Sequence, residues 1–309
     1  MRRLLLLTTV GLSLMLSCSR HDPLKSRRIV LIVQSLADAF DAHLVEGAQL
    51  AAAERNLDLT IIGIEEKTHV ERQAALIENA VIRRVGALII YPTDSKALIA
   101  PLKKATKKGI AVIAVANPLD PEMMKKQDLT IPFVGPDNKQ AGTNMAELLA
   151  QKIEGKGKVA VLQGVAGMRG AELREQGFRE ACKQCPGVQI VAQVTTNWRR
   201  KGAADALAKI LAEHPDLKGV YAVNAAMALG ATDAVKAKGK TGAIAIAAYG
   251  TSKAARDAIL AGTLTATVDP HADTIGARVI ELAEKMMEGK TVPESTTTPI
   301  DAVEAQALK

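Results

Sequence analysis

Aromatic side chains are scarce in this sequence, which has one Trp, three Tyr and three Phe among 309 residues. A core must therefore be built from Ala, Val, Ile and Leu, and any aromatic outside the core attracts attention. The chain is 48% hydrophobic and 24% charged, which is ordinary for a globular protein. This composition excludes a disordered tail, a collagen-like fibre and a multi-span membrane protein. The length fits about two domains of ~150 residues each.

Signatures of catalysis and metal binding are also missing. The sequence has no G-x-S-x-G elbow, no H-E-x-x-H motif and no phosphate-binding G-x-x-x-x-G-K-[ST] after a strand. The five His residues do not cluster near Cys182 and Cys185, so this C-x-x-C lacks the two further ligands of a metal site. We therefore expect no enzyme, no metal and no cofactor.

The pair of Cys182 and Cys185 closes a predicted helix just before Pro186 and Gly187. The helix dipole disfavours a thiolate at that end, which argues against a redox-active motif. The sequence instead predicts a local structural disulfide, formed in an oxidising compartment.

Excess positive charge, +7 with a pI of about 9.2, is one feature of nucleic-acid-binding proteins. Here the Lys and Arg residues are spread along the whole chain among Glu and Asp, and no basic run is interleaved with aromatics. We expect no nucleic-acid partner.

The N-terminus carries a secretory signal. Arg2 and Arg3 precede an apolar run at residues 4–16 that is too short to span a membrane, and Ser17 and Cys18 follow it. Residues 15–18 (MLSC) resemble the lipobox of bacterial lipoproteins. Residues 1–17 are predicted to be a cleaved signal peptide, Cys18 the lipidation site and residues 18–27 a tether. The protein is then exported to the periplasm or cell surface and anchored to the membrane. A plain signal peptide is the alternative.

Apolar runs alternate with helical patterns from residue 28 onward, which predicts an α/β fold with doubly wound parallel sheets. A helix capped by Ser95 is expected to run to Lys108. There are too many strands for one compact sheet, and residues 87–116 weakly echo residues 219–249, so two similar lobes are expected. The predicted strands lie at residues 28–33, 57–64, 87–90, 111–115, 131–134, 159–162, 188–194, 219–223, 243–247 and 265–268.

Polar and aromatic side chains gather just after these strands, at the edge where such sheets bind ligands. Four of the aromatics lie there, although few are needed in the core. Amides and carboxylates beside them suit the recognition of hydroxyl groups. Helix capping by Asp38 or Asp41 remains an alternative role for those two residues. The candidate ligand-binding residues are Gln34, Asp38, Phe40, Asp41, Tyr91, Asn117, Arg174, Asn197, Trp198, Asn224, Tyr249 and Asp269.

Several longer motifs, spread over residues 28–305, resemble one protein family. They are residues 29–40 followed by EGAQ at 46–49, YPTDS at 91–95, LQGVAG at 162–167 with Arg174, NAAMALG at 224–230 and GTLTATV at 262–268. Together they resemble the ribose/galactose-type (type I) periplasmic binding proteins, and the ribose-binding branch most.

The resemblance implies two similar lobes joined by three crossovers, with a ligand held between them. Carried over by position, the N-terminal lobe comprises residues 28–133 and 270–296, and the C-terminal lobe residues 134–269 and 297–309. The implied function is a monomeric extracytoplasmic solute-binding protein of a sugar-type ABC importer. It would capture a monosaccharide, polyol or related small molecule by hinge closure and meet the permease subunits. A ligand-presenting sensor subunit for a membrane receptor and a binder of an amine-containing solute are the alternatives.

The resemblance also assigns roles within the site. Phe40 matches an aromatic that stacks on the sugar ring, Arg174 and Asn224 match polar contacts, and Asn197 or Trp198 matches a second aromatic. Arg174 is expected to face Asp269, Asp38 or the ligand. Three positions depart from the ribose-binding pattern, which speaks against ribose itself. Ala116 and Asn117 stand in place of an Asp-Arg pair, Tyr249 in place of an Asp, and Asp269 in place of an amide.

Overall fold

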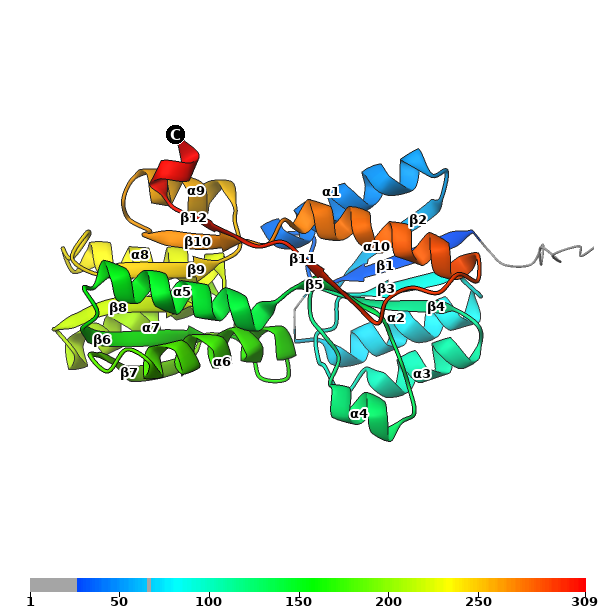
Figure 1. Ribbon diagram of the computed structural model, residues 1–309, viewed down its shortest axis with the longest axis horizontal. Helices are drawn as coiled ribbons and strands as arrows, with labels where there is room; N and C mark the ends of the chain where they lie inside the picture. Colours follow the sequence, from blue (N-terminus) through cyan, green and yellow to red (C-terminus); the bar gives the residue numbers. More distant parts are fainter. Residues whose placement is uncertain (1–26, 66–67) are drawn as a thin grey trace, which may run out of the picture.

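A computed structural model describes residues 27–65 and 68–309 of the chain. The predicted signal peptide, Cys18 and all but the last residue of the tether lie outside the described residues. The chain forms two α/β lobes, each with a six-stranded sheet covered by helices (Figure 1). Among the described residues, no helix is both long enough and apolar enough to cross a membrane.

The first lobe has a parallel sheet with strand order β11-β5-β4-β3-β1-β2. Its strands are continuous apolar runs where helices bury both faces, as in β1 and β3. Two helices cover one face and two cover the other. The strands are β1 (Arg28–Val33), β2 (Asp58–Gly63), β3 (Ala87–Ile90), β4 (Ala111–Val115), β5 (Phe133–Pro136) and β11 (Ser295–Thr298). The helices are α1 (Ala39–Glu54) and α10 (Ala272–Met287) on one face, α2 (Val70–Ile82) and α3 (Ile99–Lys107) on the other, and the short α4 (Pro121–Lys126).

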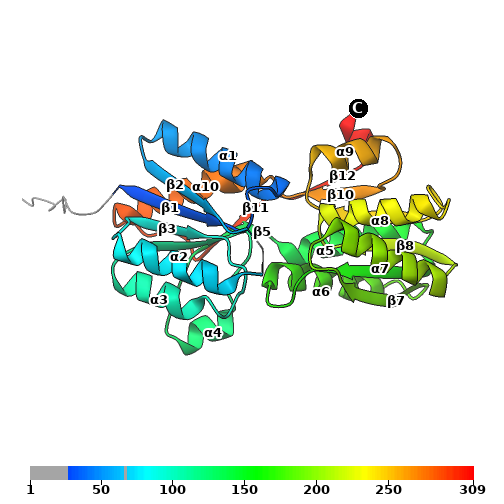
Figure 2. The same cartoon turned by 180° about the vertical axis from the view of Figure 1, so that it is seen from behind.

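The second lobe repeats this plan with strand order β12-β10-β9-β8-β6-β7, in which only β12 is antiparallel to its neighbour. Figure 2 shows it from behind, with α7 and α8 on the near side. The strands are β6 (Gly157–Gln163), β7 (Val188–Thr195), β8 (Leu217–Ala222), β9 (Ala245–Tyr249), β10 (Ala266–Asp269) and β12 (Asp301–Val303). The helices are α5 (Asn138–Lys152), α6 (Arg169–Lys183), α7 (Arg200–Glu213), α8 (Ala225–Ala237), α9 (Lys253–Leu260) and the 3₁₀ turn η1 (Ala305–Leu308).

The chain passes between the lobes three times, between β5 and α5, between β10 and α10, and between β11 and β12. Strand pairing shifts two of the boundaries expected from the sequence. β5 continues to Pro136 rather than ending at residue 133 or 134, and β11 continues to Thr298 rather than 296, because the two strands pair with each other over their whole length. The connecting segments are short, so they can act as a hinge.

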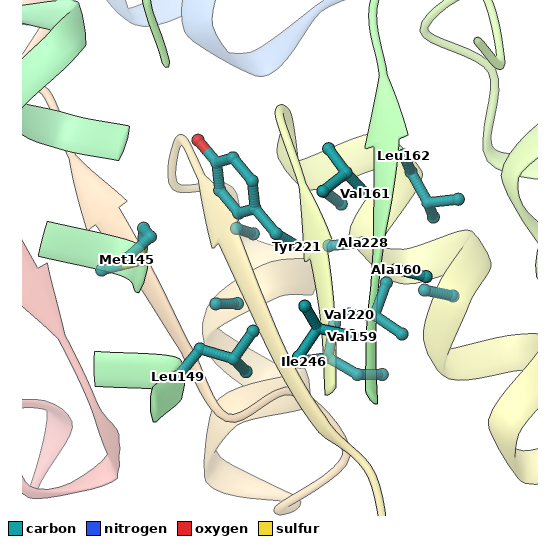
Figure 3. Close-up of a cluster of buried hydrophobic side chains, with 14 of the residues drawn as sticks. Met145, Leu149, Val159, Ala160, Val161, Leu162, Val220, Tyr221, Ala228 and Ile246 are labelled. Carbon is teal, nitrogen blue, oxygen red and sulfur yellow. The ribbon is translucent and has the colours of Figure 1, made fainter. Parts of the chain in front are cut away.

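Aliphatic side chains form most of the core, as the scarcity of aromatics requires. In the second lobe, Val159 and Val161 of β6 lie on one face of the sheet, whereas Val220 of β8 and Ile246 of β9 lie on the other, so apolar side chains cover both faces (Figure 3). Two aromatics of this core, Phe178 and Tyr221, stack with ring centroids 4.4 Å apart and planes inclined by 8°. Burial of this kind stabilises the fold by roughly 25 cal/mol per Å² of apolar surface.

The structure corrects the predicted start of the third helix. Ser95 does not cap a helix, since α3 begins at Ile99. The Asp94 carboxylate instead accepts hydrogen bonds from the amides of Lys96 and Ala97. This Asx-type turn satisfies backbone groups that a longer helix would have satisfied.

The predicted disulfide is absent, because Cys182 and Cys185 are free thiols. Cys182 packs into the core of the second lobe as a small apolar side chain. Burial, together with the neighbouring Cys185, raises the pKa of the Cys182 thiol to about 11.

Candidate ligand-binding site between the lobes

A cavity of about 190 Å³ lies between the two lobes, at the carboxyl ends of their strands. The first lobe contributes the β1–α1 loop and the end of β3, and the second contributes α6, the β7–α7 and β9–α9 loops and the start of α8. Eight of the twelve candidate residues line it. They are Gln34, Asp38, Phe40, Tyr91, Arg174, Trp198, Asn224 and Tyr249.

A larger hollow of about 880 Å³ opens at the opposite end of the second sheet. It is lined by residues such as Lys158, Lys218 and Ala245, which stand at the beginnings of strands. Because parallel α/β sheets bind ligands at the carboxyl ends of their strands, the smaller cavity is the candidate site.

Aromatic rings from both lobes form the apolar walls of the cavity. Phe40 and Tyr91 of the first lobe meet edge to face, with centroids 5.6 Å apart and planes at 61°, while Trp198 and Tyr249 belong to the second lobe. Ring faces of this kind suit the apolar C–H face of a small ring-shaped ligand.

Backbone geometry directs Trp198 into the cavity. Asn197 and Trp198 both adopt left-handed conformations, with φ of 52° and 62°, and Asn197 is exposed. Of the two positions only Trp198 lines the cavity, and its stacking on a ligand stays a prediction. Gly164 makes room for the indole, because a Cβ at that position would lie 2.2 Å from Cη2 of Trp198.

Three polar side chains on the cavity wall are held by the backbone around them. The Gln34 amide nitrogen donates to Pro92 O at 2.9 Å, the Asp38 carboxylate accepts from Phe40 N at 3.0 Å, and Asn224 Oδ1 accepts from Met227 N at 2.9 Å. Asp38 and Asn224 are thus N-caps of α1 and α8. Capping uses one oxygen of each residue, which leaves the Nδ2 group of Asn224 as a donor for a ligand.

Arg174 comes from α6 and is almost fully buried. Its guanidinium lies over the Tyr249 ring, 4.1 Å from the centroid, and its Nη1 donates to Oδ1 of Asn138 at 2.5 Å. Neither Asp269 nor Asp38 is among these two contacts, and the third expectation, that Arg174 faces the ligand, stays a prediction. Asp269 is turned away, because its carboxylate accepts from His271 N at 3.0 Å and lies 3.4 Å from the Arg256 guanidinium.

Two buried polar atoms, an acceptor and a donor, belong to residues that line the cavity and have no hydrogen-bond partner among the described residues. They are Oε1 of Gln34, from the first lobe, and Nε of Arg174, from the second. An unsatisfied buried polar group costs about 1–3 kcal/mol. Ligand hydroxyls can supply what both atoms need, since a hydroxyl donates one hydrogen bond and accepts others.

Burial strengthens the preference of the two tyrosines of the site for the neutral form, which an ordinary tyrosine already has at pH 7. It is the main cause that raises the pKa of Tyr91 well above its ordinary value and that of Tyr249 to about 12, although the positive charge of Arg174 opposes the shift. Both phenol groups can therefore donate hydrogen bonds at neutral pH.

Four candidate residues do not line the cavity. Asn197 is exposed, and Asp269 is engaged as described above. Asp41 is buried in the first turn of α1, where its carboxylate accepts from Ser35 N at 2.5 Å. Asn117 uses its side-chain amide in contacts with backbone groups, since Nδ2 donates to Pro92 O and Oδ1 accepts from Gly170 N, each at 2.7 Å.

The cavity also includes residues absent from the candidate set. Thr251 and Ser252 follow β9 directly, so their position after a strand was a usable signal, and Ser252 also caps α9. Met168 and Leu229 line the wall without any marker in the sequence. Among residues 27–65 and 68–309, no group of three or more His, Cys, Asp or Glu residues is placed to hold a metal ion.

Comparison with known proteins gives consistent matches along the chain. The model of the periplasmic binding protein domain matches residues 29–291. The D-ribose/D-allose-binding protein of Pseudomonas aeruginosa is 35% identical, covering 98% of both chains. The D-allose-binding periplasmic protein of Escherichia coli is 29% identical, covering 93% of this chain and 91% of that protein.

A solved structure shows the same arrangement of the chain. It is a periplasmic solute-binding protein of an ABC transporter from Actinobacillus succinogenes, crystallised with D-allose. The TM-score is 0.88 at 30% identity, with 91% of this chain and 98% of that one covered.

Proposed function

Because this chain belongs to the periplasmic binding protein family, we propose that its interlobe cavity captures a monosaccharide or a polyol of similar size. The chain is an extracytoplasmic solute-binding protein of the sugar-binding ABC transporter type, and not an enzyme. What is proposed here is the ligand class, the residues that contact it, the closure and the anchor.

The observation that carries the proposal is a cavity lined by polar and aromatic side chains of both lobes, among them Gln34 and Arg174, which each keep a buried polar atom without a hydrogen-bond partner, Oε1 and Nε. Four aromatic residues line the same cavity, and the Asn224 amide adds a further donor. Ring faces together with one acceptor and two donors match a small molecule whose hydroxyls surround an apolar ring face.

Relatives with known ligands support the same class. The names of the two curated relatives state D-ribose, D-allose or both, and the structure from Actinobacillus succinogenes contains D-allose. A solute-binding protein from Agrobacterium vitis, 28% identical to this chain, was solved with D-fucose. The missing Asp-Arg pair at Ala116 and Asn117 argues against ribose as the preferred ligand, since such charged groups grip ring hydroxyls strongly.

A thermal-shift screen tests the ligand class directly. The panel contains D-ribose, D-allose, D-fucose and myo-inositol, with amino acids, amines and sugar acids as comparison compounds. A ligand that binds only the folded state adds about 2.7 kcal/mol of stability at a hundredfold excess over its dissociation constant. Stabilisation by a neutral sugar or polyol is expected. Stabilisation by amino acids or anionic acids alone would contradict the proposal.

Closure of the lobes is the proposed mechanism of capture. Gln34, Asp38 and Phe40 belong to the first lobe, and Arg174 and Asn224 belong to the second, so neither lobe holds a complete site. A ligand that needs both sets of contacts shifts the population toward the closed form. The permease subunits would then recognise the closed form of the monomer.

The proposed anchor is a lipid on Cys18, supported by the apolar run and the lipobox-like residues 15–18. A single acyl chain binds membranes only marginally, so stable attachment requires several chains on this one cysteine. Labelled palmitate should enter the wild-type chain and a Cys185→Ala control, but not Cys18→Ala. Equal labelling of all three proteins would show that Cys18 is not the site of lipid attachment.

A further inference from the structure

We propose that Asn138 is a positioning residue, which holds the Arg174 guanidinium at the ligand cavity and links it to the first lobe. The inference rests on the proposed function, in which Arg174 contacts the ligand. Asn138 itself does not line the cavity.

Asn138 is the first residue of α5, immediately after the crossing from β5, and it is only 2% exposed. Both the oxygen and the nitrogen of its side-chain amide make hydrogen bonds. Oδ1 accepts the hydrogen bond from Arg174 Nη1, and Nδ2 lies within donating distance of Pro136 O at 3.3 Å and Ala116 O at 3.4 Å. One side chain therefore connects the crossing, the end of β4 and the cavity arginine.

The backbone of Arg174 is fixed independently of this bond. Helices α5 and α6 are in direct contact at Gly142, where a Cβ would lie 1.9 Å from the carbonyl oxygen of Arg174. Only the long side chain remains to be ordered, and its guanidinium contacts Tyr249 and the Asn138 amide. Ordering such a side chain costs up to about 2 kcal/mol in rotamer entropy, so a prearranged guanidinium favours binding.

Asn138 also joins groups that belong to different lobes. Ala116 follows β4 of the first lobe, whereas Asn138 and Arg174 belong to helices of the second. Rotation of the lobes about the crossings would separate Asn138 from Ala116 O, while Pro136, two residues away, stays near it. The contact with Ala116 O therefore depends on the arrangement of the lobes, whereas the bond to Arg174 lies within the second lobe.

NMR of the arginine Nε–Hε groups tests the positioning without any ligand. The ring current of Tyr249 should displace the Arg174 signal, which Arg174→Lys identifies by its loss and Tyr249→Leu confirms. Asn138→Ala should move this signal toward the position of an exposed arginine, whereas Asn138→Asp, which keeps the acceptor, should largely preserve it. Asn144→Ala is the matched control, because Asn144 lies on the same helix and its side chain accepts a hydrogen bond from Gln140 of that helix rather than from Arg174.

Titration with D-allose provides a second readout. Asn138→Ala should weaken binding about tenfold, the loss expected for a hydrogen bond to a charged group. In an Arg174→Gln background the same change should cause no further loss. If Asn138→Ala does not fold, Asn138→Ser replaces it, since the shorter side chain cannot reach Arg174.

Two results would overturn the inference. One is an unchanged Arg174 signal in Asn138→Ala. The other is a loss of affinity on Asn138→Ala that is as large in the Arg174→Gln variant as in the protein that keeps Arg174. Failure of wild-type protein to bind any neutral sugar or polyol would instead refute the proposed function. The NMR comparison would still decide whether Asn138 holds Arg174.

Discussion

The backbone amide of Gly170 donates a hydrogen bond to Oδ1 of Asn117 over 2.7 Å, across the boundary between the two lobes. Asn117 is fixed on the first lobe by its own bond to Pro92 O, and Gly170 stands in the first turn of α6. A second bond, from Ser95 N to Gly167 O at 2.9 Å, crosses the same boundary. The position expected to contact the ligand therefore serves here to join the lobes.

Removal of this bond should favour the open form. Asn117→Ala leaves the Gly170 amide without its partner in the closed form, at a cost of about 1–3 kcal/mol, whereas water can solvate that amide in the open form. X-ray scattering should show a larger radius of gyration for unliganded Asn117→Ala than for wild type or for the control Asn79→Ala, an exposed site on α2. Identical radii would contradict a role in holding the lobes together.

Trp198 should report ligand binding by its fluorescence. It is the one tryptophan of the sequence, and it lines the cavity. A ligand stacked on the indole changes its polarity and exposure, so the emission of the wild-type protein should shift on titration with the bound sugar. A wild-type emission that stays constant while calorimetry shows binding would place the ligand elsewhere.

Asn224 has two roles that one substitution can separate. Its Oδ1 caps α8 through Met227 N, and its Nδ2 is the proposed donor to the ligand. Asn224→Ala should lower the free energy of unfolding by about 0.5–2 kcal/mol through loss of the cap. It should also weaken binding by about 1–3 kcal/mol. Asn224→Asp keeps the capping oxygen and loses the donor, so only its binding should fall. Denaturant melts and calorimetry of the two variants distinguish the effects.

The Tyr221 hydroxyl should be dispensable for stability. It is buried and has no hydrogen-bond partner among the described residues, whereas its ring stacks on Phe178. Tyr221→Phe keeps the stacked ring and removes an unsatisfied group, so its free energy of unfolding should be unchanged or higher by up to about 1 kcal/mol. Tyr221→Leu, which loses the stack, should be less stable than wild type. A marked destabilisation of Tyr221→Phe would reveal a bonded hydroxyl.

Cys182 should make stability depend on pH in the alkaline range. Burial raises the pKa of its thiol from 9.0 to about 11 in the folded chain. The unfolded state therefore loses this proton first, and its contribution to stability, complete below pH 9, decreases as pH rises toward 11. Cys182→Ala should show a smaller decrease in the free energy of unfolding between these values. At pH 8, iodoacetamide should modify Cys185 before Cys182, and the reverse order would contradict the burial.

The sequence predicted the central strands well, because strands buried on both faces are continuous apolar runs. β1, β3 and β4 are such runs, and they lie where the sequence placed them. β11, with the sequence STTT, and the three-residue β12 carry no such pattern. These two edge strands exist because β5 and β10 offer them backbone partners, which is information that local sequence does not hold.

The candidate site shows a similar division. Position at strand ends brought Phe40, Tyr91, Trp198 and Tyr249 into the candidate set, and the structure places all four on one cavity wall or another. The partner of Arg174 was not predictable in this way. Asn138 lies 36 positions away on another helix, and neither periodicity nor composition indicates which of several polar residues a buried guanidinium will meet.

The interleaving of the lobes also bears on how the chain folds as it is made. Helix α10 covers the same face of the first sheet as α1, and β11 completes that sheet's edge, yet both follow almost the whole second lobe in the sequence. Contacts between segments this distant form slowly, because a long loop must close before they can stabilise anything. The first lobe to be synthesised is therefore among the last parts to be completed. The sheet of the first lobe therefore cannot be completed until the chain has been synthesised through residue 298.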